Sequence, residues 1–187
     1  MEPGSGVRRQ RPRQRRIREH RQGVSKRLLV VWWTMTGGTR QLVDAFRDGA
    51  GAQEGVELVV RRADEAQPSD LLAADAVLFA TPENLASMAG MMKDFFDRSY
   101  YAALGRVEGR PYATLVCAGS DGQGAARQIA RIATGWRMKP VAEPLVVITH
   151  AQTPEAILAP KSIDAASLDR ARELGAAMAA GVSMGIW

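Results

Sequence analysis

Five short, predominantly apolar runs recur along the chain after residue 27. They occupy residues 28–33, 56–60, 76–80, 112–117 and 145–149. Runs of this length without regular alternation are typical of strands that are covered on both faces of a parallel sheet. The pattern therefore predicts five buried parallel strands.

Apolar residues with helical spacing fill most of the segments between these runs. They form stripes within residues 42–50, 88–99, 129–136 and 168–178, while Leu71 and Leu72 predict a shorter helix. Strands that alternate with helices predict βαβ units, whose right-handed crossovers place helices on both faces of the sheet. We therefore expect an α/β fold, with ligands bound beyond the carboxyl ends of the strands.

The richest of the loops at that edge follows the first predicted strand and reads T-M-T-G-G-T-R over residues 34–40. Gly37 and Gly38 allow a tight turn that presents N–H groups, and three threonines add hydroxyl donors at the start of a helix. This combination favours a phosphate monoester. The alternative is that the glycines only form a turn and a threonine caps the helix, which would use one of the three hydroxyls.

Two other phosphate-binding loops are excluded by spacing. A Walker loop requires a longer glycine spacing and a lysine before Ser or Thr, and neither is present here. The dinucleotide fingerprint G-x-G-x-x-G is absent after the first strand, and the partial match at Gly119, Gly122 and Gly124 follows the fourth.

Charge divides the chain into two parts. The formal net charge is +5, with 46% hydrophobic and 24% charged residues. Residues 1–27 carry ten basic and two acidic side chains, a net +8, whereas the rest carries fifteen basic and eighteen acidic ones, a net −3. We expect a disordered arginine-rich arm at residues 1–26 and one domain at residues 27–187.

The arm has several interpretations. It is a solvated tail, an electrostatic tether to nucleic acid or anionic lipid, a targeting segment, or the result of a start codon assigned too far upstream. Nucleic acid is expected as a partner only through this arm. The single cysteine excludes an internal disulfide, and no apolar run is long enough to span a membrane. We expect a cytoplasmic protein.

Two further motifs join the loop at residues 34–40, namely D-A-V-L-F-A-T-P-E-N at residues 75–84 and M-K-D-F-F-D-R at residues 92–98. Together they resemble the flavodoxin-like FMN proteins, and most of all their NAD(P)H-dependent FMN reductase and WrbA-type quinone reductase branch. The resemblance covers residues 27 to about 180. It implies a three-layer α/β/α sandwich with a five-stranded parallel sheet in the order 2-1-3-4-5.

The resemblance also implies where FMN binds. The first loop would hold the ribityl phosphate, the loop after the third strand would line the isoalloxazine, and the loop after the fourth would close its other edge. The corresponding residues are Thr34, Met35, Thr36, Gly37, Gly38 and Thr39, then Thr81, Pro82, Glu83, Asn84 and Leu85, and then Ala118, Gly119, Ser120, Asp121 and Gly122. Gly38 stands where many relatives carry Asn.

The implied activity is an FMN-binding oxidoreductase with NAD(P)H as a transient hydride donor and a quinone, flavin or similar small molecule as acceptor. Because a flavin supplies its own redox chemistry, no catalytic side chain and no metal is expected. The absence of aromatic residues at positions 82–87 favours a reductase over an electron carrier. The alternatives are a flavodoxin-like one-electron carrier and a cofactor-free α/β interaction module. The resemblance implies a homo-oligomer.

Overall fold

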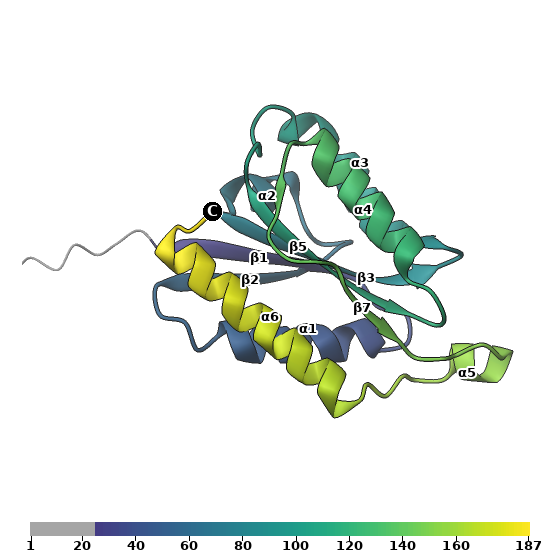
Figure 1. The fold of residues 1–187 in the computed structure, drawn as a ribbon. Helices are drawn as coiled ribbons and strands as arrows, with labels where there is room; N and C mark the ends of the chain where they lie inside the picture. Colours follow the sequence, from purple (N-terminus) through teal and green to yellow (C-terminus); the bar gives the residue numbers. More distant parts are fainter. Residues whose placement is uncertain (1–24) are drawn as a thin grey trace, which may run out of the picture.

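The computed structural model describes residues 25–187, and its centre is a mixed sheet whose main strands are parallel (Figure 1). All five predicted strands are present, as β1 Lys26–Trp32, β2 Val56–Arg62, β3 Ala76–Asn84, β5 Pro111–Ala118 and β7 Leu145–Ile148. Nearly all of the predicted arm lies outside the described residues. The first strand begins at the last residue assigned to the arm, Lys26.

The five main strands have the predicted spatial order. β1 pairs with β2 and β3, and β3 pairs with β5, which pairs with β7, all in parallel. Two additional strands of two residues each were not predicted, β4 Ser87–Met88 and β6 Lys139–Pro140. β4 turns back antiparallel along the end of β3, and β6 pairs with the beginning of β5. The sequence order 2-1-3-4-5 is thus confirmed for the main strands.

Helices cover both faces of the sheet, as expected (Figure 1). The elements are α1 Gly38–Ala50, α2 Pro68–Ala73, α3 Gly90–Ala103, α4 Gln123–Gly135 and α6 Ala165–Met184. One core cluster joins α1 and α6 to residues such as Leu28 and Val30, and the other joins α2, α3 and α4 to Leu29 and Val31. Each fully buried aliphatic side chain contributes roughly 1.5–3 kcal/mol to stability.

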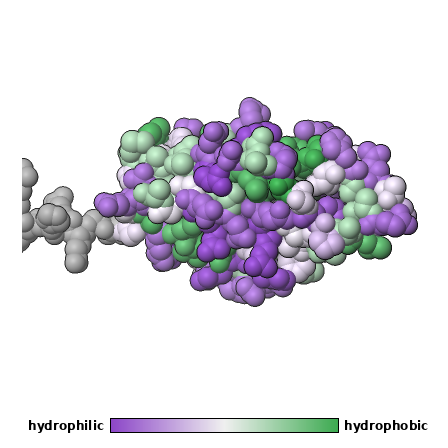
Figure 2. All heavy atoms as spheres, turned by 90° about the horizontal axis from the view of Figure 1, so that it is seen from below, coloured by the Kyte–Doolittle hydropathy of each residue, from purple (hydrophilic) through white to green (hydrophobic). Residues whose placement is uncertain are grey.

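Two glycines allow α1 and α6 to pack backbone against backbone. A Cβ atom added to Gly49 would lie 1.9 Å from the carbonyl oxygen of Arg172, and one added to Gly175 would lie 2.1 Å from that of Phe46. Real Cβ atoms do not approach backbone so closely, so both positions require glycine. Seen from the side of this helix pair, the surface is mostly hydrophilic, with small scattered hydrophobic areas (Figure 2).

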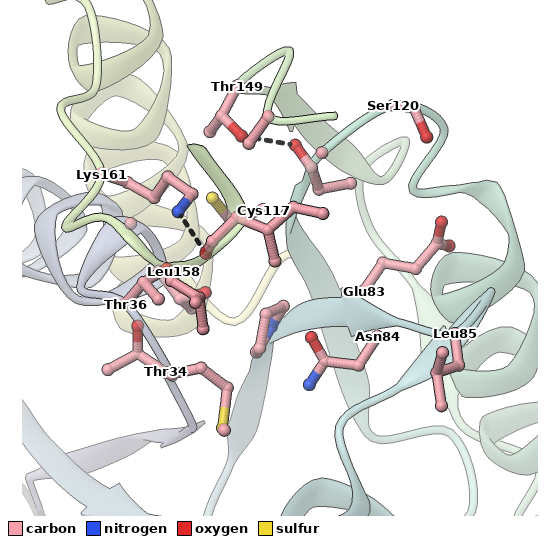
Figure 3. A pocket seen from close by; sticks show the side chains of 18 of the residues that line it. Thr34, Thr36, Glu83, Asn84, Leu85, Cys117, Ser120, Thr149, Leu158 and Lys161 are labelled. Carbon is pink, nitrogen blue, oxygen red and sulfur yellow. Dashed lines mark hydrogen bonds between the residues drawn. The ribbon is translucent and has the colours of Figure 1, made fainter. Parts of the chain in front are cut away.

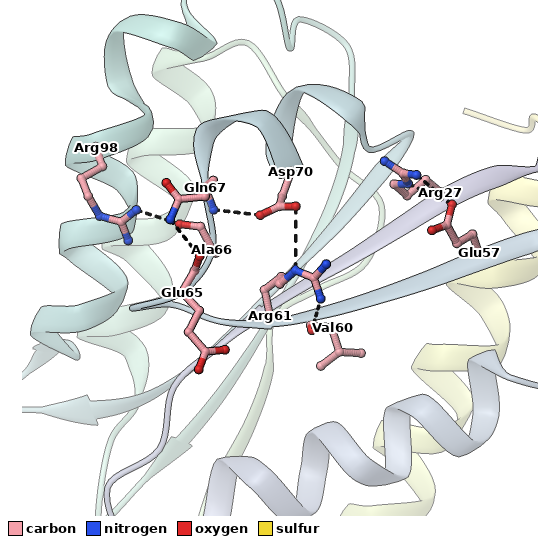
Figure 4. A network of polar contacts seen from close by, with 9 residues as sticks. All are labelled: Arg27, Glu57, Val60, Arg61, Glu65, Ala66, Gln67, Asp70 and Arg98. Atoms are coloured by element: carbon pink, nitrogen blue, oxygen red, sulfur yellow. Dashed lines mark hydrogen bonds and ion pairs between the residues drawn. The ribbon is translucent and has the colours of Figure 1, made fainter.

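On the opposite face, polar contacts hold the connection between β2 and α2 (Figure 4). The Arg98 guanidinium of α3 donates to the carbonyl oxygens of Ala63 and Ala66, both at 2.7 Å. The Gln67 N–H donates to Asp70 at 2.8 Å and so closes the first turn of α2. Arg98 therefore fixes a loop far from it in sequence.

The connection from β7 to α6 contains a short helix that the apolar pattern did not predict, α5 Pro154–Leu158. Its first turn is capped by Thr153, whose hydroxyl oxygen accepts from the Ala156 N–H at 3.3 Å. In Figure 1 this helix lies beyond the carboxyl end of β7. Within residues 25–187, no helix is long and apolar enough to cross a membrane.

Candidate functional site

A cavity of about 480 Å³ opens at the carboxyl ends of β1, β3 and β5, where the sequence predicted a site (Figure 3). This volume falls within the range of about 300–1,000 Å³ that is typical of small-molecule sites. Its walls come from four segments: the loop after β1, the end of β3, the end of β5, and the connection from β7 to α6. The lining residues are Thr34, Met35, Thr36, Gly38, Thr39, Pro82, Glu83, Asn84, Leu85, Ala86, Cys117, Ala118, Gly119, Ser120, Thr149, Ala151, Ile157, Leu158 and Lys161.

The loop after β1 forms one end of the cavity. The Thr34 hydroxyl oxygen accepts from the Gly37 N–H at 3.0 Å, and Gly37 has a φ of +87°, which is unfavourable for other residue types. The first backbone bond of α1 runs from the Gln41 N–H to the Gly37 carbonyl oxygen at 3.2 Å. The N–H groups of residues 38–40 precede this bond and have no acceptor within the helix.

Thr39 lines the same end of the cavity. Its side chain is 1% exposed, and its hydroxyl has no hydrogen-bond partner among the described residues. A buried polar atom without a partner is unfavourable unless a ligand or water supplies one. Free N–H groups and an unpaired hydroxyl at a helix N-terminus fit the oxygens of a phosphate monoester. The residues present therefore fit the predicted phosphate group.

Gly38 packs too tightly to carry a side chain. A Cβ atom there would lie 2.6 Å from the Cys117 sulfur and 3.3 Å from the Cβ of Lys161. The structure thus gives a reason for glycine at this position. Cys117 is 7% exposed, and burial raises the pKa of its thiol to about 11. It is therefore a neutral wall of the cavity near pH 7.

The β3–β4 hairpin forms the opposite end. Its two turn residues, Leu85 and Ala86, have φ values of 52° and 58°, and neither is a glycine or asparagine. Two positive φ angles are what a two-residue hairpin of this kind requires. The hairpin is held by Gln128 of α4, whose side-chain oxygen accepts from the Ser87 hydroxyl at 2.7 Å and from the Met88 N–H at 3.0 Å. The Leu85 side chain is fully exposed at the cavity mouth.

Glu83 connects this hairpin to the loop after β5. Its two carboxylate oxygens accept from the Gly122 N–H at 2.8 Å and the Ala125 N–H at 2.9 Å, at the start of α4. A carboxylate is favourable at a helix N-terminus because it meets the free N–H groups and the positive end of the helix dipole. Glu83 lines the cavity, and its carboxylate fixes the hairpin and the loop after β5 relative to each other.

Twelve of the sixteen predicted binding residues line the cavity, and four do not. Thr81 is buried beneath the hairpin, where its hydroxyl accepts from the Ala89 N–H at 3.1 Å and donates to the Pro82 carbonyl at 3.0 Å. Gly122 caps α4 and packs against Val146, while Asp121 is exposed. Gly37 shapes the first loop through its backbone. These four residues lie next to the site without forming its wall.

Seven lining residues were not predicted from the sequence, namely Ala86, Cys117, Thr149, Ala151, Ile157, Leu158 and Lys161. Most follow β7, in or near the short helix α5. The only local signal for this helix is Thr153-Pro154-Glu155, a capping residue followed by proline and an acidic residue. His150 is exposed and does not line the cavity.

Comparison with known proteins agrees with this geometry. Residues 65–153 match the family of NADPH-dependent FMN reductases. A flavodoxin of Aquifex aeolicus is 31% identical over 106 residues, which are 56% of this chain and 55% of that protein. An NAD(P)H dehydrogenase (quinone) of Acidithiobacillus ferrooxidans is 29% identical over 93 residues, 39% of this chain and 46% of that protein. The chain thus spans about half the length of these curated relatives.

Solved structures of flavodoxins share the fold. A flavodoxin from the domain Archaea superposes with a TM-score of 0.66 and 21% identity, covering 83% of this chain and 98% of that one. A WrbA-like flavodoxin from Agrobacterium tumefaciens gives 0.61 and 19%, covering 86% and 99%. The chain is therefore a flavodoxin-like protein by fold, and its likeness to the FMN reductase family confirms the resemblance that its motifs predicted.

Proposed function

We propose that the cavity binds FMN and that the protein is an NAD(P)H-dependent oxidoreductase that reduces a quinone, a flavin or a similar small acceptor. The observation that carries this proposal is the unpaired buried hydroxyl of Thr39 beside the free N–H groups of the first turn of α1. These donors lie at one end of a cavity whose other end is bounded by β3 and β5.

The phosphate would bind at residues 34–39. The polar groups without a partner there are the N–H groups at the start of α1 and the Thr39 hydroxyl, and all of them can donate a hydrogen bond. The isoalloxazine would lie between the hairpin at residues 82–86 and the loop at residues 118–120. Glu83 supports both walls, since its carboxylate joins the end of β3 to the start of α4. The chain's contribution is thus to bind and orient the ring, because the flavin itself accepts the hydride and passes two electrons on.

The open ring site favours a reductase. None of the residues that line the cavity is aromatic, so no stacked side chain from the described part of this chain would cover the ring. The exposed side chains of Met35, Leu85 and Leu158 surround the mouth and offer apolar contact to a flat acceptor or to a nicotinamide. A ring that is accessible at its face can react directly with NAD(P)H.

A one-electron carrier is the second candidate, because a relative named flavodoxin is 31% identical over 106 residues. Anaerobic addition of NADH or NADPH to the FMN-loaded protein separates the two. A reductase loses its visible flavin absorbance rapidly and recovers it when a quinone is added. A carrier keeps its absorbance with both nucleotides but loses it with dithionite.

A further inference from the structure

The backbone of Lys161 is fixed against the predicted phosphate loop. Its N–H donates to the Thr36 carbonyl oxygen at 2.8 Å. The side-chain amide of Gln41, in the second turn of α1, donates to the Lys161 carbonyl at 2.6 Å and accepts from the Ile163 N–H at 3.2 Å. The connection between β7 and α6 is thereby attached to the start of α1.

The side chain of Lys161 follows the same surface. Its Cβ lies 3.3 Å from the position that a Cβ of Gly38 would take, so its stem passes the first turn of α1. Its ammonium group donates to the carbonyl oxygens of Ala156, Ile157 and Ala159 at 2.8, 2.8 and 2.6 Å. The positive charge is therefore held in place by the α5 segment without help from a ligand.

The two charged side chains that line the cavity differ in the groups that stabilise them. Of the described residues that line it, only Glu83 and Lys161 are charged. The Glu83 carboxylate is stabilised by two N–H groups of α4, whereas Lys161 forms no ion pair with any carboxylate of residues 25–187. Figure 3 shows Lys161 beside Thr36 at one end of the cavity and Glu83 at the other.

The end of the cavity near Lys161 thus combines a cation, an unpaired hydroxyl and free backbone N–H groups. All three features complement an anion. We propose that Lys161 is a fixed positive charge beside the phosphate of FMN, which stabilises this anion electrostatically and makes the site prefer the phosphorylated flavin over riboflavin. This inference rests on the proposed function and assigns the charge to a segment outside the loop after β1.

The test compares two ligands that differ only in the phosphate. FMN and riboflavin are titrated into the flavin-free protein and into the Lys161→Gln variant, with flavin fluorescence as the readout. We expect Lys161→Gln to weaken FMN binding about tenfold, the lower end of what a charged contact contributes, and to change riboflavin binding by less than about twofold. Added salt should weaken FMN binding more in the parent protein than in the variant.

Three further variants separate charge from structure. Lys161→Arg keeps the charge and should retain most of the FMN affinity. Arg47→Gln removes an exposed charge in the last turn of α1 and should leave both affinities unchanged. Gln41→Leu keeps the charge but releases the Lys161 backbone from the start of α1, and should therefore weaken FMN binding more than riboflavin binding.

Two results would overturn the inference: Lys161→Gln binding FMN as tightly as the parent protein, or losing FMN and riboflavin by equal factors. A parent protein that binds neither flavin contradicts the proposed function itself, and the inference with it. Binding of FMN with no preference over riboflavin contradicts the inference and the placement of the phosphate at residues 34–39, but leaves the cavity as a flavin site.

Discussion

At the scale of single residues, replacing Thr39 should have different effects on protein stability and on FMN binding. Its buried hydroxyl lacks a partner among the described residues, and such a group costs about 1–3 kcal/mol relative to one that is paired. In Thr39→Val the shape is nearly kept and the hydroxyl is lost. We expect the free energy of unfolding of the flavin-free protein to stay the same or rise by about 1 kcal/mol in urea titrations.

The same substitution should weaken FMN binding about tenfold, because the phosphate loses a donor. Thr39→Ser, which keeps the hydroxyl, is the matched control and should retain the affinity. Unchanged FMN binding in Thr39→Val would show that this hydroxyl serves no ligand.

The buried thiol of Cys117 predicts that the free energy of unfolding depends on pH. Burial raises the pKa of its thiol from 9.0 to about 11 in the folded protein. Between these two pKa values the folded state keeps a proton that the unfolded chain loses. The contribution of the neutral thiol to the free energy of unfolding is therefore complete below pH 9 and is lost as the pH rises to about 11. The two pKa values set an upper limit of about 2–3 kcal/mol on this loss.

The measurement is the urea stability of the parent protein and of Cys117→Ser between pH 8 and 11. The difference between the two proteins isolates the thiol from the lysines and tyrosines that titrate in the same range. We expect the parent to lose more stability than the variant over this interval. Parallel curves would mean that the thiol is not shielded from solvent.

At the scale of elements, the close contact between α1 and α6 requires glycine at positions 49 and 175. Gly175→Ala places a Cβ 2.1 Å from the Phe46 carbonyl oxygen, so the helices must separate. We expect a loss of about 1–3 kcal/mol in the free energy of unfolding, measured with urea. Gly135→Ala in α4 is the control, since a Cβ there meets no atom within 4 Å, and its stability should be unchanged or higher.

The main elements could be predicted because their signals are local. Continuous apolar runs identified the five main strands, and helical stripes identified α1, α3, α4 and α6. The hairpin between β3 and β4 was missed because its turn residues, Leu85 and Ala86, are not the glycine or asparagine that usually indicate such a turn. The helix α5 was missed because it has five residues and buries none of them, so it leaves no apolar stripe.

The candidate site was predicted to a similar extent. Motif positions found the loops after β1, β3 and β5, because these follow recognisable strands. The roles of individual side chains depend on contacts between distant segments. Glu83 binds the start of α4, Thr81 turns inward, and Lys161 approaches the first turn of α1 from 120 residues away in sequence. No local pattern encodes these contacts.

At the scale of the whole molecule, the fold brings four distant segments to one edge of the sheet and leaves a cavity between them. One end offers hydrogen-bond donors and a cation, and the other is formed by the β3–β4 hairpin and the loop after β5. This division corresponds to the two ends of FMN, which are an anionic phosphate and a flat ring. The homo-oligomer implied by the sequence stays a prediction, and so does the electron acceptor.

The visible absorption spectrum tests the central claim most directly. The protein is purified without added flavin, mixed with excess FMN, and separated from unbound ligand by gel filtration. We predict flavin absorbance that corresponds to one FMN per chain, with much less retained when riboflavin replaces FMN. A folded protein that emerges colourless after incubation with FMN would contradict the assignment of this cavity as a flavin site.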